Sequence, residues 1–425
     1  MLFSLFSGGD NDLTQLMTRL IIQLGIILLA AKLSGELCQR YLKIPSVLGE
    51  LFAGILIGPY ALGGIHILNF GALFPINGTS LGSLPISVEI YFIAQIASII
   101  LLFVVGLETE IKLFLKYGVP ALVVALGGVI FPFILGLFPT YLLGFSDSLF
   151  GAQALFMGTI MTATSVGITA RVLEELRSLD SPEGVTILAA AVVDDVIGMI
   201  ILAIVVGIST IGIINAGEVI GIGAKAIGVW LILTIGGILI APFLGKVIGK
   251  FQDKGAAIVL FIALGCLGAA IAELFGLAMI IGAYSIGLAL SRTKLKTKIH
   301  EPIMGVYNFL VPIFFVVMGM QVNLSSILGD NTTIIFGLII SVLGIISKVF
   351  GSGIPALFVG FTRIGAMKIG FGMLPRGEVS LIIAQVGLSK GIIDQDLYAV
   401  AIMLTITTTI LAPILLIKVF KKTQQ

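Results

Sequence analysis

The sequence predicts an all-α polytopic membrane protein, and three observations support that prediction. Of its 425 residues, 58% are hydrophobic and only 11% are charged, which gives a mean hydropathy of +1.19. Soluble domains carry about 25% charged residues, so a water-soluble fold is excluded. Apolar runs of bilayer-spanning length recur along the chain, and roughly 20 residues suffice for a span. Lysine and arginine gather in alternate connections between these runs.

About thirteen transmembrane helices are expected, each centred on one apolar run. Their approximate ranges are 13–37, 47–63, 89–107, 118–143, 149–170, 184–208, 218–245, 255–273, 277–291, 302–322, 333–359, 364–388 and 396–418. The second and ninth runs are short for a helix that crosses at right angles to the bilayer. No soluble domain is expected before or after the spans.

The basic residues of the connections predict an orientation. If the N-terminus lies outside, nearly all loop lysines and arginines fall on the inside, and Lys390 is the clear exception. This alternation follows the positive-inside rule. It favours an odd number of spans and a cytoplasmic C-terminus. The net charge of +2 gives no indication of a nucleic-acid partner, and Cys38 and Cys266 suggest neither a disulfide framework nor a metal site.

The layout indicates two inverted repeats. Spans 1–6 and 8–13 form two sets of six, and the span between them turns the second set upside down. The fifth span of each set is interrupted at its centre, over 161–169 (MTATSVGIT) and 372–378 (GMLPRGE). Paired interruptions of this kind point to a transporter site at a repeat interface. Unwound backbone is tolerated at that depth only where it lines protein or a cavity.

Two adjacent acids, Asp194 and Asp195, lie near the middle of the sixth apolar run. A carboxylate at bilayer depth costs several kcal/mol and is a functional-site hypothesis by default. Neighbouring residues on a helix point about 100° apart, so one acid can face a partner helix while the other faces a water-filled cavity. The alternative is a paired structural acid beside a tolerated one.

Three further charges lie near mid-membrane: Lys348 halfway along the eleventh span, and Arg376 and Glu378 at the second interruption. A buried lysine needs a carboxylate partner or must lose its proton. Asp194 or Asp195 can supply that partner while the other acid takes a cation. Arg376 and Glu378 can neutralise each other, and we interpret them as charge-compensating groups that tune the field of the site.

The first interruption is rich in hydroxyl groups. Thr162, Ser165 and Thr169 are spaced as i, i+3 and i+7, which is one face of a helix, and Thr164 lies between them. Such hydroxyls, together with unwound carbonyls, are hard oxygen ligands for a small dehydrated cation. We predict that Thr162, Thr164 and Ser165 belong to an ion-binding site with the two aspartates. The alternative is helix packing, because small and hydroxyl residues are common at transmembrane interfaces.

With these residues in view, the chain resembles the monovalent cation:proton antiporter-2 family, and most closely the bacterial NapA-type sodium/proton antiporters. The resemblance covers nearly the whole chain. It is carried by the segments 44–59 (IPSVLGELFAGILIGP), 103–109 (FVVGLET), 162–172 (TATSVGITARV), 193–198 (VDDVIG), 312–320 (PIFFVVMGM), 347–351 (SKVFG) and 375–379 (PRGEV).

The resemblance implies the sodium/proton antiporter fold, with two inverted six-helix repeats, crossed broken helices and a homodimer in a prokaryotic plasma membrane. It implies dimerisation panels at 1–116 (helices 1–3) and 251–325 (helices 8–10), core helices at 117–208 (4–6) and 326–425 (11–13), and a linker helix 7 at 209–250. It also implies that Asp195 binds the monovalent cation and that Asp194 forms a salt bridge with Lys348. No enzymatic activity is expected, and no cofactor besides the transported ions.

This sequence differs in two respects from the potassium-efflux members of the family. Potassium-efflux relatives carry a cytosolic nucleotide-binding domain, which is not expected in this chain. Some of them have Gln where Asp194 stands, whereas an Asp-Asp pair with a lysine looks like the electrogenic sodium-type branch. The expected function is therefore exchange of Na⁺ or Li⁺ for protons by alternating access.

Several alternatives stay open. The first is K⁺/H⁺ antiport in the same family, because spacing alone does not separate the two ions. The others are sodium-coupled solute symport and a passive cation channel. An intramembrane aspartyl protease is disfavoured, because its two acids come from different helices and the sequence has no Gly-x-Gly-Asp motif.

Overall fold

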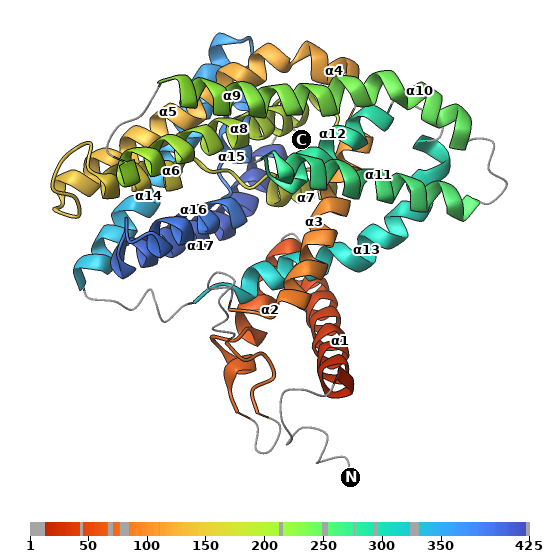
Figure 1. Ribbon diagram of the computed structural model, residues 1–425, viewed down its shortest axis with the longest axis horizontal. Coiled ribbons are helices and arrows are strands. Elements are labelled where there is room, and N and C mark those ends of the chain that lie inside the picture. Colours follow the sequence, from red (N-terminus) through yellow and green to blue (C-terminus); the bar gives the residue numbers. More distant parts are fainter. Residues whose placement is uncertain are drawn as a thin grey trace. The chain divides into compact units, whose positions relative to one another are not determined.

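The computed structural model describes ten ranges of the chain. They are 13–42, 46–66, 71–76, 85–109, 111–211, 216–248, 254–275, 277–291, 296–323 and 331–421. Within these ranges the secondary structure is helical (Figure 1). The described residues contain no strand, only one isolated antiparallel bridge between His66 and Ala72.

The helices follow the predicted apolar runs. They are α1 (Leu13–Leu37), the π-helix η2 (Cys38–Leu42), α2 (Ser46–Ile57), the 3₁₀ helix η3 (Leu62–Gly64), α3 (Val88–Glu108), α4 (Ile111–Lys116), α5 (Gly118–Leu142), α6 (Ala152–Thr162), α7 (Val166–Glu175), α8 (Pro182–Ile211), α9 (Ala216–Leu231), the π-helix η5 (Ile232–Gly236), α10 (Gly237–Ile248), α11 (Lys254–Leu274), α12 (Met279–Leu290), α13 (Lys296–Met320), α14 (Asn331–Phe358), α15 (Arg363–Gly372), α16 (Glu378–Ser389) and α17 (Gln395–Lys421).

Ten helical stretches among the described residues are long and apolar enough to cross a bilayer. They coincide with predicted spans 1–6, 8, 10, 11 and 13. Three shorter apolar helices, at 227–243, 279–290 and 379–388, fall within predicted spans 7, 9 and 12. The chain is therefore a multi-pass, all-helical membrane protein, whereas the count of thirteen spans stays a prediction.

The chain divides into two compact units, and the first comprises residues 1–98 and 307–328. In this unit α2 packs closely on α1 and on α13. A Cβ at Gly49 would overlap the Ser34 carbonyl of α1, and a Cβ at Gly54 would overlap the Val316 carbonyl of α13. Glu50, one residue after Gly49, is buried. Glycine therefore permits backbone-to-backbone packing here, as is usual between transmembrane helices.

The second unit, residues 99–306 and 329–425, contains both predicted interruptions and every mid-membrane charge singled out above. Its helices α5 and α14 cross where Gly127 meets Gly351, and each carbonyl lies where a Cβ of the other glycine would stand. An apolar cluster in the same unit is drawn mainly from α6 and α17, with smaller contributions from α8, α14 and α16. The functional charges thus lie inside a tightly packed helical body.

Candidate functional site

Two helices of the second unit are broken at mid-length. α6 ends at Thr162, residues 163–165 are extended, and α7 begins at Val166. Likewise α15 ends at Gly372, and α16 begins at Glu378 after five non-helical residues, 373–377. These bounds confirm both predicted interruptions. Each break leaves backbone N–H and carbonyl groups without helical partners, and buried groups of this kind need partners from elsewhere.

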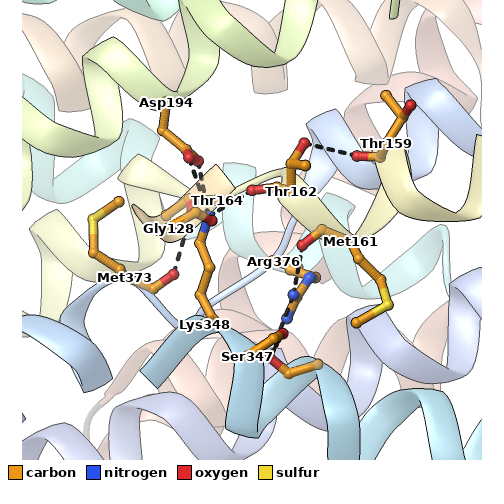
Figure 2. A network of polar contacts seen from close by, with 11 residues as sticks. Gly128, Thr159, Met161, Thr162, Thr164, Asp194, Ser347, Lys348, Met373 and Arg376 are labelled. Atoms are coloured by element: carbon orange, nitrogen blue, oxygen red, sulfur yellow. Dashed lines mark hydrogen bonds and ion pairs between the residues drawn. The ribbon is translucent and has the colours of Figure 1, made fainter. Parts of the chain in front are cut away.

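The two breaks supply partners to each other. Three hydrogen bonds join them: from the Ser165 amide to the Pro375 carbonyl (2.7 Å), from the Thr164 hydroxyl to the Met373 carbonyl (3.3 Å) and from the Thr169 hydroxyl to the Gly372 carbonyl (2.7 Å). Donors of the first break thus serve carbonyls of the second. Figure 2 shows Thr164 beside Met373 at this junction. The interrupted segments are therefore held together although about 200 residues separate them in the sequence.

Lys348, in the middle of α14, extends its side chain toward this junction and is 0% exposed. Its Nζ atom donates to four oxygen atoms: the Gly128 carbonyl of α5 at 2.7 Å, the Thr162 carbonyl of α6 at 2.5 Å, and both Asp194 carboxylate oxygens at 3.1 Å. The ion pair between Lys348 and Asp194 implied by the family resemblance is thus present. An ammonium fully enclosed in oxygens avoids the cost of an unpaired buried charge.

The two adjacent acids of α8 have different surroundings. Asp194 is 2% exposed and holds Lys348, and the Thr164 side chain lies next to it. Asp195 is 4% exposed and interacts electrostatically with Lys348 without belonging to that ion pair. Only Asp194 belongs to the ion pair with Lys348, which agrees with the expected divergence of successive side chains on a helix.

Arg376 is the second buried cation of the site and lies within the second break. Its Nη2 atom donates to the Met161 carbonyl at 2.7 Å and to the Gly344 carbonyl at 3.5 Å. Its own carbonyl accepts a hydrogen bond from Thr409 of α17. The predicted pairing with Glu378 stays a prediction, because the Glu378 side chain lies outside the described residues.

One expectation about the hydroxyl groups was wrong. Thr162, Ser165 and Thr169 do not share a helical face, because the helix stops after Thr162 and resumes at Val166. Helical spacing does not apply across unwound backbone. The Thr162 hydroxyl instead donates to the Thr159 carbonyl at 2.8 Å. The Ser165 hydroxyl is buried and has no hydrogen-bond partner among the described residues.

The described charges of the site balance. Asp194 and Asp195 supply two negative charges, and Lys348 and Arg376 supply two positive ones, all of them buried. Glu378, the acid proposed to pair with Arg376, lies outside the described side chains, so this count leaves out one acid of the second break. Among the described residues no group of three or more His, Cys, Asp or Glu side chains could hold a metal ion.

Sequence reasoning expected unwound carbonyls at the site but did not identify which carbonyls take part, nor that they bind Lys348 and Arg376. The carbonyls of Gly128, Met161 and Thr162 all bind buried cations. A side-chain motif cannot reveal a carbonyl acceptor. For Thr162 the signal was the interruption that follows it. For Gly128 the signal was a proline four residues later, Pro132, which lies inside α5.

The chain is similar in sequence to several known proteins. A family model described as sodium/hydrogen exchanger, transmembrane, matches residues 25–422. A Na⁺/H⁺ antiporter of Enterococcus hirae is 31% identical over 93% of this chain and 97% of its own. The high-affinity Na⁺/H⁺ antiporter NhaS3 of Synechocystis is 34% identical over 94% of this chain and 90% of its own. The Na⁺/H⁺-K⁺ antiporter GerN of Bacillus cereus is 34% identical over 92% and 94%.

A solved structure supports the fold. The sodium proton antiporter MjNhaP1 of Methanocaldococcus jannaschii superposes with a TM-score of 0.70, covering 94% of this chain and 95% of that chain. The sequence identity is 18%. At this identity the likeness concerns the fold alone.

Proposed function

Because this chain belongs to the sodium/hydrogen exchanger family, we propose that it exchanges a monovalent cation, Na⁺ or Li⁺, for protons across a membrane by alternating access. The observation that supports this most directly is a buried pair of adjacent carboxylates in which Asp194 is occupied by Lys348 and Asp195 stands outside that ion pair. The relatives named above are transporters, and the function proposed for this chain is likewise transport.

Asp195 is the proposed site of competition. When it holds a proton or a cation, its charge is neutralised and the site can be carried across the apolar barrier. A bare carboxylate cannot cross, because an uncompensated charge in a low-dielectric interior costs too much free energy. This prohibition couples the movement of one ion to the movement of the other. Thr162, Thr164 and Ser165 are proposed to add oxygen ligands from the first break.

Lys348 is the proposed source of an electrogenic cycle. Its ammonium pairs with Asp194. We propose that an arriving cation displaces this pairing and that Lys348 then releases its proton, so that two protons are exchanged for one cation. Arg376 stays charged throughout and, with Glu378, compensates the charge of the site.

The finer architecture is part of the same proposal. It comprises thirteen spans in two inverted six-helix repeats, with an outside N-terminus, a cytoplasmic C-terminus and a homodimer in the plasma membrane. In this proposal the helices of 1–116 and 251–325 form the dimerisation panel, those of 117–208 and 326–425 form the moving core, and 209–250 is the linker helix. The breaks at 163–165 and 373–377, in corresponding spans of the two sets, support this scheme.

The test is a flux measurement in proteoliposomes loaded with a pH-sensitive dye. Na⁺, Li⁺ and K⁺ are titrated separately over a range of pH. Wild-type protein should move protons in response to Na⁺ and Li⁺, and Asp195→Asn should abolish this response. Asp147→Asn, which makes the same change at an exposed loop acid, should leave it intact. Retained exchange in Asp195→Asn would overturn the assignment of Asp195.

Potassium is the second candidate cation, because the relative GerN is named a Na⁺/H⁺-K⁺ antiporter. The same titration separates the two. A response to K⁺ at concentrations equal to or below those needed for Na⁺ would replace the sodium assignment with K⁺/H⁺ antiport.

A further inference from the structure

The helix α5 contains a proline in its interior, Pro132, four residues after Gly128. In an α-helix the N–H of each residue bonds the carbonyl of the residue four positions earlier. Proline has no N–H, and its ring presses against that same carbonyl. Residue 132 therefore offers no hydrogen bond to the Gly128 carbonyl. This oxygen instead accepts a hydrogen bond from Lys348 at 2.7 Å.

The approach of α14 to this carbonyl depends on the absence of a side chain at position 128. A Cβ there would lie 2.5 Å from the Ser352 hydroxyl oxygen and 3.7 Å from the Lys348 Nζ atom. Gly128, Pro132 and Lys348 are all buried. The tight crossing of α5 and α14 thus brings Lys348 to the Gly128 carbonyl of α5. This carbonyl receives no hydrogen bond from residue 132 of α5.

The second carbonyl partner of Lys348 becomes available by a different device. Thr162 is the last residue of α6, and the chain unwinds immediately after it. A helix end leaves its last carbonyls without helical partners. Lys348 therefore binds two backbone carbonyls as well as Asp194. The Gly128 carbonyl lacks its usual helical donor because of Pro132, and the Thr162 carbonyl lacks one because α6 ends there.

We propose that Pro132 is a positioning residue for the exchange reaction: it frees the Gly128 carbonyl to serve as a fixed acceptor for the Lys348 ammonium in the state without a transported cation. This inference rests on the proposed function of Lys348 as the group that the cation displaces. Pro132 does not touch the cation. It sets how strongly the lysine competes with the cation for Asp194.

Pro132→Ala restores a backbone N–H that competes with Lys348 for the Gly128 carbonyl. The charged groups that act on Lys348 stay in place: Asp194 and Asp195 from α8, and Arg376 from the second break. With one acceptor weakened, the ammonium yields to the cation more readily. Stabilisation by Na⁺ should therefore set in about 0.5 to 1 pH unit lower, which corresponds to a sodium affinity at fixed pH that is about 3- to 10-fold tighter.

The experiment measures the Na⁺-dependent rise in unfolding temperature of the purified full-length protein over a series of pH values. Pro139→Ala is the matched control, because it removes the other interior proline of the same helix. The carbonyl that Pro139 leaves without a bond from residue 139 belongs to Leu135, whereas the oxygens that bind Lys348 in the described part of the chain belong to Gly128, Thr162 and Asp194. Pro139→Ala should leave the sodium response unchanged. An alanine in either position is compatible with a helix.

Two results would overturn the inference. One is an unchanged sodium response in Pro132→Ala. The other is a response that moves to higher pH with weaker sodium binding, which would mean that the carbonyl serves the cation and not the lysine. The shift must also vanish in a Lys348→Met background, since the two changes should be coupled.

Failure of the proposed function is distinguishable from failure of this inference. If the wild-type protein shows neither sodium-driven proton flux nor stabilisation by sodium, the proposed function fails. The positioning role is then tested without sodium. The effect of Pro132→Ala on unfolding temperature should differ between the wild-type and Lys348→Met backgrounds, and equal effects in both would end the inference.

Discussion

The two helix breaks differ in how their charges are arranged. The first break, after α6, has no charged residue of its own, and the carbonyls of Met161 and Thr162 are bound by cations that come from other segments. The second break contains its own cation, Arg376, which reaches back to the first. Both buried cations of the site therefore meet at the C-terminal end of one short helix.

The macrodipole of α6 explains this convergence. A helix C-terminus carries a partial negative charge, and cations near it are stabilised. In the proposed function, a cation that reaches Asp195 thus enters a region where two resident cations already bind the favourable carbonyls. The two breaks thus differ in their electrostatic roles. The first break provides carbonyls that bind cations, and the second provides one of those cations, Arg376. Each substitution below tests one side of this contrast.

Lys348→Met should have the largest effect, because it removes the cation that bridges Asp194 and the first break. A buried ion pair that loses one partner costs about 3–5 kcal/mol. We expect a loss of this size in the free energy of unfolding at neutral pH. The loss should shrink as the pH falls, since a protonated Asp194 no longer needs a counter-charge. Thermal unfolding of purified protein across pH measures both quantities.

The matched control for this substitution is Lys368→Met. Lys368 pairs with Glu183 at 3.4 Å, and both side chains are partly exposed, at 13% and 17%. Partly exposed ion pairs contribute about 0–1 kcal/mol. Equal losses in the two variants would show that the first break does not depend on its buried cation. In flux assays Lys348→Met should also reduce the dependence of exchange on membrane potential, and an unchanged charge per ion would argue against its proton role.

Arg376→Met should have the next largest effect. It leaves the Met161 carbonyl without its 2.7 Å donor and removes one positive charge from the site. A hydrogen bond from a charged group contributes about 1.5–3 kcal/mol. We expect a loss of stability in this range together with weaker proton–cation exchange. Arg376→Lys should restore the charge and part of the stability, because an ammonium cannot reproduce the spread of donors on a guanidinium.

A result in which Arg376→Met unfolds like the wild type would remove the second break from this scheme. The outcome is informative because two guanidinium nitrogens, Nε and Nη1, have no hydrogen-bond partner among the described residues. The contribution of Arg376 to the first break therefore depends chiefly on the single nitrogen Nη2.

Thr169→Val should have a moderate effect, because it removes one of the bonds between the breaks and nearly keeps the side-chain volume. The Thr169 hydroxyl donates to the Gly372 carbonyl at 2.7 Å in a fully buried position. A buried carbonyl that loses its donor costs about 1–3 kcal/mol. Thr169→Ser keeps the hydroxyl and should lose less stability than the valine variant. Equal unfolding temperatures for both variants would show that this bond does not hold the breaks together.

Sequence reasoning succeeded where side chains or hydropathy carried the signal. The apolar runs located the helices, and the short polar segments located both breaks. The pairing of Lys348 with Asp194 was implied by the family resemblance, whereas spacing alone left either aspartate possible. Sequence reasoning failed where the backbone conformation determines which groups are in contact. The helical spacing of Thr162, Ser165 and Thr169 lost its meaning once residues 163–165 unwound.

The carbonyl partners show the same limit in another form. Every residue has a carbonyl, so a sequence cannot mark the few that bind an ion. Only the residues that remove a helical donor can mark them, such as Pro132 for Gly128 or the break itself for Thr162. The role of Glu378 stays a prediction for a different reason, because its side chain lies outside the described residues.

Ser165→Ala should have the smallest effect on stability. The Ser165 amide holds the Pro375 carbonyl at 2.7 Å, and this bond survives the substitution. The hydroxyl is buried without a partner among the described residues, so its removal should change the free energy of unfolding by less than about 0.5 kcal/mol. A buried hydroxyl that does not add to stability is available to bind an ion.

If Ser165 is a ligand, Ser165→Ala should raise the sodium concentration for half-maximal exchange about 3- to 10-fold at constant maximal rate, since a hydrogen-bond-sized contact contributes about 0.5–1.5 kcal/mol. An unchanged sodium dependence in this stable variant would remove Ser165 from the ion site and leave Thr162 and Thr164 as the side-chain ligands proposed from the first break.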